Sequence, residues 1–212
     1  MASRACRAAC SADLGSSTPP VLRTTSLVHL LASSFLRPGD VAVDATCGRG
    51  RDALVLARLV LHPDRMGRLH ALDLHPSALE STQQLLQAHL DDVQLQHVHL
   101  HRADHADLAH HVDADVALVL FNLGYLPGAK QDGLYTRADT TRMALDASQE
   151  ILKDNGAVVI TTYVGHPGGM EEDEAVSTWM HSRPSQSWTT GCWRFANRKD
   201  APRTYVAVKH VR

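Results

Sequence analysis

The chain has 212 residues, of which 44% are hydrophobic and 21% are charged, and this suits one well-packed domain over residues 23–212. Its formal net charge of -2 provides no overall basic field, so a nucleic-acid partner would have to meet a local basic surface. No run approaches the roughly 18 apolar residues of a membrane span, which argues against insertion in a membrane.

Residues 1–22 are rich in Ala, Ser and Arg and contain one acidic residue, Asp13. This composition is typical of plastid and mitochondrial transit peptides, and equally of a disordered leader without a targeting role. We expect a plastid or mitochondrial location in the first case and a cytoplasmic one in the second. The cysteines form no C-x-x-C pair, which fits a reducing compartment. The sequence does not fix the oligomeric state, and a homodimer is compatible with it.

The apolar pattern predicts alternating strands and helices. Strands are expected over residues 41–43, 68–72, 93–100, 116–121, 157–163, 187–195 and 205–208. Helices are expected from Thr25 to the break at Pro38-Gly39, and over residues 51–61, 76–90, 138–152 and 171–180. Alternation implies parallel strands with helical crossovers, and the last two strands have no helix between them. The predicted fold is therefore α/β, a doubly wound, mostly parallel seven-stranded sheet with a C-terminal antiparallel hairpin.

The loop after the first predicted strand, Asp44-Ala-Thr-Cys-Gly-Arg-Gly50, is the candidate cofactor site. Ligands of open α/β sheets bind beyond the carboxyl ends of the strands. Gly48 and Gly50 allow the backbone to approach a ligand, and the following helix offers free N–H groups there. Asp73 ends the second predicted strand, where its carboxylate could accept both hydroxyl protons of a ribose. These features predict a bound nucleoside.

The same glycines followed by Asp73 also fit a relaxed dinucleotide fingerprint. Asp44 favours S-adenosylmethionine over NAD, because a carboxylate would repel a pyrophosphate but pair with the amino group of a methionine moiety. A tight glycine turn without a ligand is the structural alternative. Asp104 could face the adenine amino group or be a solvated loop residue, and Leu74 could pack on the adenine. The other cofactor-binding candidates are Thr46, Cys47, Asp52, His105 and Asn122.

A second motif, Asn122-Leu-Gly-Tyr125, follows the apolar strand over 116–121. The Asn122 side-chain oxygen and the next backbone carbonyl could accept both protons of an amine and aim its lone pair at a methyl group. Tyr125 could stack on the base that carries the amine. The motif resembles the Asn-Pro-Pro-Tyr motif of amine-directed methyltransferases, with Leu123 and Gly124 replacing the prolines. The alternative is a turn with Tyr125 as a core aromatic residue.

Several motifs together resemble the MnmM family of tRNA 5-(aminomethyl)-2-thiouridine methyltransferases, long labelled rRNA methylases. They are Asp44-Ala-Thr-Cys-Gly-Arg-Gly-Arg-Asp52, Phe121-Asn-Leu-Gly-Tyr-Leu-Pro-Gly128, Tyr163-Val-Gly-His-Pro-Gly-Gly169 and Asn197. The resemblance covers about residues 25–212 and implies a Rossmann-like class I methyltransferase that uses S-adenosylmethionine. It further implies N-methylation of the aminomethyl group on the wobble uridine, with the tRNA anticodon stem-loop as partner.

The resemblance also implies a substrate side, formed by Leu123, Gly124, Tyr125, Thr136, Thr140, Tyr163, Gly165, His166 and Asn197. Arg198 belongs to a basic run near Asn197 that could contact tRNA or be solvated surface. An alkylammonium must lose a proton before it can act as a nucleophile. His166 is the candidate base, so the catalytic candidates are Asn122, Tyr125 and His166. Ordering of the following turn is the alternative role for His166.

Two clusters of ionisable residues carry weaker signals. His97, His99 and His101 would share one face of a strand, but a solvated edge strand explains this pattern better than a metal does, so no metal site is predicted. The acidic run over 171–174 indicates the first turn of a helix. Two other functions remain open, a methyltransferase acting on rRNA or a small-molecule amine, and a nucleotide-binding module without catalysis.

Overall fold

The computed structural model describes residues 23–113, 115–124 and 136–211. Two predictions lie outside the described residues. They are the leader over residues 1–22 and the catalytic role of Tyr125. Within the described part, no helix is long and apolar enough to cross a membrane.

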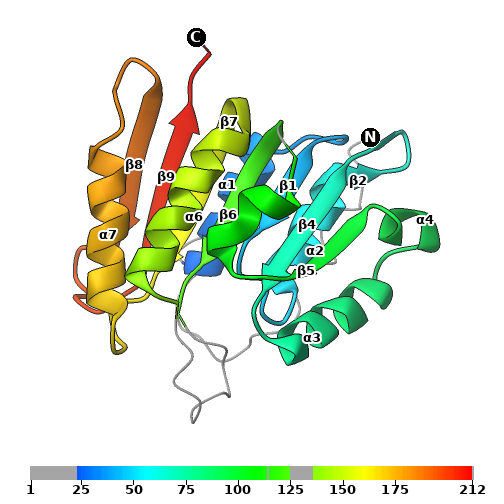
Figure 1. Ribbon diagram of the computed structural model, residues 1–212, viewed down its shortest axis with the longest axis horizontal. Helices are drawn as coiled ribbons and strands as arrows, with labels where there is room; N and C mark the ends of the chain where they lie inside the picture. Colours follow the sequence, from blue (N-terminus) through cyan, green and yellow to red (C-terminus); the bar gives the residue numbers. More distant parts are fainter. Residues whose placement is uncertain (1–22, 114, 125–135, 212) are drawn as a thin grey trace, which may run out of the picture.

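One seven-stranded sheet organises the chain, in the order β5-β4-β1-β6-β7-β9-β8 (Figure 1). The strands are β1 (Val41–Asp44), β4 (Arg68–Asp73), β5 (Val98–Arg102), β6 (Val116–Asn122), β7 (Leu152–Thr162), β8 (Trp188–Arg194) and β9 (Arg203–Lys209). The first five strands of that order are parallel, and β9 pairs antiparallel with both β7 and β8. The predicted mostly parallel sheet with a C-terminal antiparallel hairpin is confirmed.

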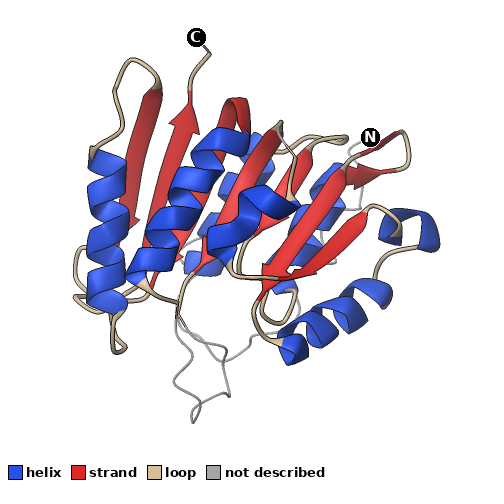
Figure 2. Cartoon of the chain, in the orientation of Figure 1, coloured by secondary structure: helices blue, strands red, loops and turns tan. Residues whose placement is uncertain are grey.

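Helices cover both faces of the sheet (Figure 2). They are α1 (Thr24–Phe35), α2 (Arg51–Val60), α3 (Pro76–Gln87), α4 (Asp92–Leu95), α5 (Leu108–His111), α6 (Ala138–Ile151) and α7 (Gly169–His181). Apolar residues of α1, α2 and α3 form one core with one face of the sheet, and those of α5, α6 and α7 form a second core on the other. Residues 116–121 of β6 are all buried because this central strand is covered on both faces.

The structure differs from the sequence prediction in three places. Residues 92–95 form α4, whereas a strand was expected from Val93, and β5 begins only at Val98. Asp91 and Gln94 close a capping box, because each side chain accepts the other residue's backbone N–H, at 2.8 and 3.1 Å. A small hairpin of β2 (Leu61–His62) and β3 (Arg65–Met66) follows α2 and was not predicted. Strand β7 begins five residues early, at Leu152, which pairs with Val116.

The histidines of β4 and β5 form a stacked group. His70 Nδ1 lies 3.1 Å from His101 Nε2, and the His70 ring stacks on the rings of His99 and His101. Among the described residues, no group of three or more His, Cys, Asp or Glu side chains is arranged to hold a metal ion. β5 is the edge strand of the sheet, which explains why His99 is exposed.

Buried His70 is expected to make the protein sensitive to acid. Burial above all, and then His99, His101 and Arg68, lower the pKa of His70 from 6.5 to about 4. The unfolded chain takes up this proton first, so the stabilisation is complete above pH 6.5 and is lost as the pH falls towards 4, by at most about 3 kcal/mol. His70→Gln should reduce the pH dependence of the free energy of unfolding between pH 6.5 and 4. Urea unfolding above, within and below it measures the slope, and an unchanged slope in the variant would contradict the assignment.

Candidate active site

Four candidate residues gather at one edge of the sheet because parallel strands end there together. Asp44 ends β1, Asp73 ends β4, Asn122 ends β6, and Tyr163 follows β7. The register pairs Asp44 with Leu120 of β6, and Asn122 with Thr161 of β7, so these ends lie side by side. This carboxyl edge is where an open α/β sheet binds its ligand.

Asp44 is a buried carboxylate with an open acceptor. Its side chain is fully buried, and Oδ1 accepts the Thr46 N–H at 3.3 Å, while Oδ2 has no hydrogen-bond partner among the described residues. Burial, followed by the nearby Asp52 charge, raises the pKa of Asp44 well above its usual range. A buried acceptor of this kind is costly unless a ligand satisfies it. The ammonium group of S-adenosylmethionine fits that requirement.

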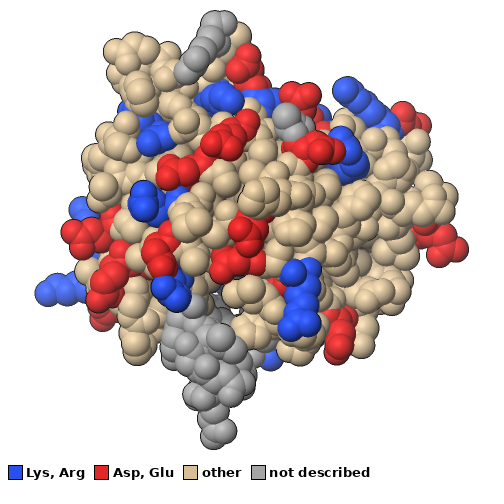
Figure 3. Space-filling model, viewed as in Figure 1, with Lys and Arg blue, Asp and Glu red and all other residues tan. Residues whose placement is uncertain are grey.

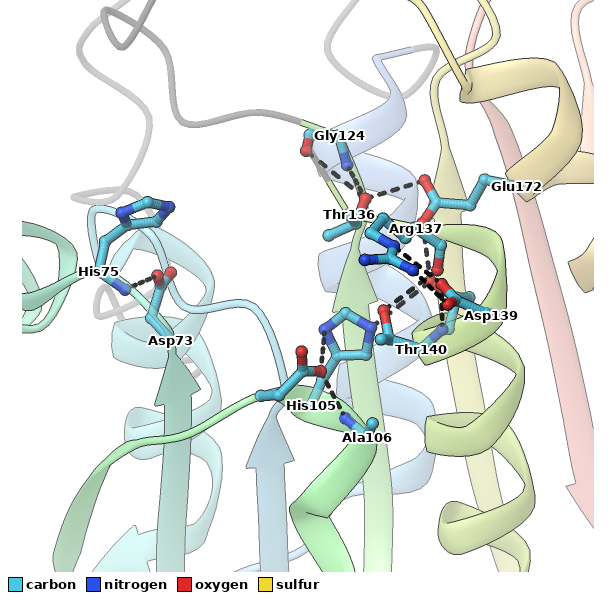
Figure 4. Close-up of polar contacts among 12 residues, drawn as sticks. Asp73, His75, His105, Ala106, Gly124, Thr136, Arg137, Asp139, Thr140 and Glu172 are labelled. Atoms are coloured by element: carbon cyan, nitrogen blue, oxygen red, sulfur yellow. Dashed lines mark hydrogen bonds and ion pairs between the residues drawn. The ribbon is translucent and has the colours of Figure 1, made fainter. Parts of the chain in front are cut away.

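The glycine loop orients a second carboxylate, that of Asp73. Gly48 and Gly50 have φ values of 52° and 77°, which favour glycine, and a Cβ on Gly50 would lie 2.8 Å from the Thr82 Cα. The Gly48 N–H donates to Asp73 Oδ2 at 2.9 Å. The His75 N–H donates to Asp73 Oδ1, also at 2.9 Å (Figure 4). Each oxygen keeps a lone pair, so the fixed carboxylate can still accept ribose hydroxyls.

Of the remaining cofactor candidates, Leu74 is 51% exposed and Asp104 starts a short 3-10 turn by accepting the Ala106 N–H at 2.9 Å. Cys47 and His105 instead point into the protein. The Cys47 thiol contacts the Thr82 hydroxyl of α3 at 3.5 Å, and burial raises its pKa.

His105 packs edge-on against Phe121, and burial lowers its pKa. Its side chain is 6% exposed. It therefore belongs to the protein interior behind the site.

The backbone and the side chain of Asn122 each donate a hydrogen bond to a neighbouring residue. Its backbone N–H donates to Thr46 Oγ1 at 2.8 Å, and its side-chain Nδ2 donates to Asp52 Oδ2 at 3.2 Å. Asp52 Oδ1 lies 2.7 Å from His29 Nε2. His29 was not predicted, because it lies in α1, outside every motif, and only the packing of α1 beside α2 brings it to the site.

A buried network supports the chain after β6. The Gly124 N–H donates to Thr136 Oγ1, and Thr136 Oγ1 donates to Glu172 Oε2, both at 2.9 Å (Figure 4). Thr141 Oγ1 donates to the other Glu172 oxygen at 2.7 Å. Glu172 is fully buried, which raises its pKa. The acidic run over 171–174 indicated only a helix start, so the roles of Glu172 and Thr141 were missed.

The substrate candidates divide into those near this network and those away from it. Thr140 lies next to Thr141, but its hydroxyl donates to the Arg137 carbonyl at 3.2 Å. The Leu123 side chain is buried in the core, so only its backbone could meet a substrate.

His166 and Tyr163 lie against Gly124. A Cβ on Gly124 would lie 3.6 Å from His166 Nε2 and 3.7 Å from Tyr163 Cδ2. His166 Nδ1 lies 2.9 Å from the Pro167 carbonyl oxygen. Because a carbonyl only accepts, Nδ1 carries a proton, and Nε2 is a buried atom that lies near Gly124 and Gly169.

The loop between β8 and β9 reaches the same edge of the sheet. Strand β8 is antiparallel to β9, which is antiparallel to β7, so the end of β8 lies at the carboxyl edge (Figure 1). Asn197 and Arg198 lie in this loop, and the Arg198 guanidinium is 5.2 Å from the centre of the Phe195 ring. In the described part of the chain, no hydrogen bond joins either residue to Asn122 or to the Glu172 network. The Asp200 carbonyl oxygen would lie 4.0 Å from a Cβ on Gly165.

Comparison with known proteins agrees with this site. Residues 69–209 match the family described as "Putative rRNA methylase". A tRNA (mnm(5)s(2)U34)-methyltransferase, chloroplastic, from Arabidopsis thaliana is 36% identical over 185 residues, which cover 85% of this chain and 67% of that protein. The chain thus spans about two thirds of that relative's length.

Two solved structures are also similar. A protein described as "putative rRNA-methylase" from Clostridium thermocellum has a TM-score of 0.80 and 29% identity, and the match covers 89% of this chain and 98% of that one. A protein described as "a putative methyltransferase" from Streptococcus mutans, in complex with SAH, has a TM-score of 0.77 and 27% identity, and the match covers 88% of this chain and 98% of that one. The chain therefore belongs to the family described above as rRNA methylases, and it is an S-adenosylmethionine-dependent methyltransferase of the class I fold.

Proposed function

We propose that the protein methylates the aminomethyl nitrogen of 5-aminomethyl-2-thiouridine at the tRNA wobble position. The observation that carries the proposal is the Asn122 side chain at the end of β6, whose Nδ2 is engaged by Asp52, which leaves Oδ1 as an acceptor for an amine N–H. The name of the Arabidopsis relative supports the choice of tRNA and of this amine.

The bound cofactor supplies an electrophilic methyl group on a sulfonium, so the residues of the chain have to orient and deprotonate the amine. In this proposal, Asn122 Oδ1 accepts a hydrogen bond from one amine N–H and so directs the nitrogen lone pair. His166 Nε2 takes the proton that the ammonium must lose, since this atom lies near Gly124. As the new N–C bond forms, the S–C bond breaks, and the products are the secondary amine and S-adenosylhomocysteine.

We also infer that the anticodon stem-loop meets the carboxyl edge of the sheet. On the face that α6 and α7 cover, acidic and basic side chains are interspersed, so this face offers no single-sign surface to a phosphate backbone (Figure 3). Arg194, Arg198 and Lys199 lie at the end of β8 and in the loop after it, at the carboxyl edge of the sheet. The homodimer and the leader in residues 1–22 stay predictions, and the word chloroplastic in the relative's name supports a plastid address.

Mass spectrometry of tRNA nucleosides from a strain that lacks the gene tests the proposed function. We expect 5-methylaminomethyl-2-thiouridine to disappear and its aminomethyl precursor to accumulate. The wild-type gene should restore the methylated nucleoside, whereas an Asn122→Ala gene should not. If the methylated nucleoside persists and no precursor accumulates, the tRNA assignment fails. Loss of a methylated nucleoside from ribosomal RNA in the same strain would point to rRNA as substrate.

A further inference from the structure

Side chains from three elements meet beside the end of β6. Asp52 of α2 contacts His29 of α1 through Oδ1, at 2.7 Å, and Asn122 of β6 through Oδ2, at 3.2 Å. The Asp52 side chain is 15% exposed and that of His29 is 34% exposed, so water competes only partly for these contacts. An ionised carboxylate only accepts hydrogen bonds, so His29 Nε2 carries a proton and fixes the position of Asp52.

The hydrogen bonds of Asn122 leave one side-chain atom for a substrate. Asp52 accepts one of the two Nδ2 protons. Because the amide group is planar, the contact of Nδ2 with Asp52 also determines the direction of Oδ1, the acceptor atom of the Asn122 side chain.

We infer that Asp52 is a positioning residue for methyl transfer, which holds the Asn122 amide in the rotamer that presents Oδ1 to the substrate amine. His29 supports Asp52 in this role. The inference rests on the proposed function of Asn122. Without Asp52, rotation of the amide would present Nδ2 to the amine, and a donor facing a donor cannot orient the nitrogen lone pair.

Two other roles of Asp52 predict different results. As a cofactor ligand, Asp52 would matter for the affinity for S-adenosylmethionine. As the acidic second residue of α2, it would matter for stability, through the partial positive charge at the helix N-terminus. A positioning residue instead affects kcat, because it acts on the aim of Asn122 and touches neither the cofactor nor the reacting atoms. The three roles can therefore be separated by measuring kcat, the affinity for S-adenosylmethionine and the free energy of unfolding.

The first experiment compares Asp52→Ala with Asp52→Asn, using tRNA that carries the aminomethyl precursor. Asp52→Ala should lower kcat roughly 10- to 100-fold, while the calorimetric Kd for S-adenosylmethionine stays within about threefold. Asp52→Asn should recover most of kcat, since its Oδ1 still accepts from Asn122 and its amide can donate to the other tautomer of His29. Equal losses in the two variants, or a weaker Kd with unchanged kcat, would overturn the inference.

A double-mutant cycle tests whether Asp52 acts through Asn122. The Asp52→Ala, Asn122→Ala double variant should be no slower than Asn122→Ala alone, because the side chain that Asp52 positions is already gone. Additive losses would show an independent role. Glu171→Gln is the matched control, since Glu171 is an exposed acidic residue in the first turn of α7, and it should leave kcat unchanged.

A measurement without turnover keeps this inference separate from the proposed function. The chain contains three asparagines, Asn122, Asn155 and Asn197, so 15N labelling of Asn gives three side-chain amide signals, and loss of one in Asn122→Ala assigns it. Asp52→Ala should shift the Asn122 signal and speed its hydrogen exchange, with the other two unchanged. An unshifted signal would refute the positioning. If the signal shifts but wild-type protein does not methylate the tRNA, the proposed function fails instead.

Discussion

Replacement of Asn122 by Ala should lower kcat for methyl transfer by about 100-fold or more, and leave the affinity for S-adenosylmethionine within a few fold of wild type. The variant removes the Asn122 side-chain oxygen at the end of β6, whose neighbouring amide nitrogen already donates to Asp52. The backbone N–H of residue 122 keeps its bond to Thr46, so the cofactor loop should keep its shape. Single-turnover kinetics with calorimetric binding measures the two quantities separately.

An isosteric variant sharpens the prediction. Asn122→Asp keeps an acceptor oxygen but places a second carboxylate about 3 Å from Asp52, where like charges repel and one pKa rises. It should therefore be as slow as Asn122→Ala despite its similar shape. Asn155→Asp makes the same change at an exposed position near the start of β7 with φ of 60°, which Asp tolerates, and it should behave as wild type. Wild-type turnover in either Asn122 variant would remove this residue from catalysis.

Replacement of Asp44 by Asn or Ala should weaken the binding of S-adenosylmethionine and stabilise the free protein. Loss of a buried partner for an ammonium group costs about 2 to 4 kcal/mol, or roughly 30- to 1000-fold in Kd. In the free protein, the same carboxylate is buried with Oδ2 unpartnered and lies near Asp52 and Asp73, so its removal should raise the Tm. Calorimetry and thermal unfolding of each variant measure the two effects.

The pH dependence of Asp44 has a definite sign. Burial raises its pKa, so the contribution of Asp44 to the stability of the free protein is complete at acid pH and is lost as the pH rises towards that pKa. An ammonium partner favours the ionised carboxylate, so affinity for the cofactor should increase as the pH rises through the same interval. Asp44→Asn should remove both contributions, whereas Asp139→Asn, a control on an exposed carboxylate, should keep them. If Asp44→Asn keeps the wild-type affinity and slope, Asp44 is not the ligand of the amino group.

The sequence by itself determined the architecture and the motifs of the cofactor loop. Strands buried on both faces need continuous apolar runs, as over 116–121, and helices on a sheet need an apolar stripe. The alternation of strands and helices could therefore be predicted from the sequence. Asp44, Asp73 and Asn122 were predictable because each follows a strand, and parallel strands end at one edge. Local hydrogen bonds misled the prediction at 92–95, where a capping box outcompeted the β-prone Val93.

Only the tertiary structure decided which side chains meet. Thr141 reaches Glu172, whereas the hydroxyl of the neighbouring Thr140 donates to the Arg137 carbonyl, because one residue turns a helix position by about 100° and so changes the face on which it lies. Likewise, Asp52 was predicted to bind the cofactor, and its side chain in α2 bridges His29 and Asn122, residues 23 positions before it and 70 positions after it. Side-chain direction and contacts between distant elements arise from packing α1 and α2 against the sheet, and no local pattern encodes them.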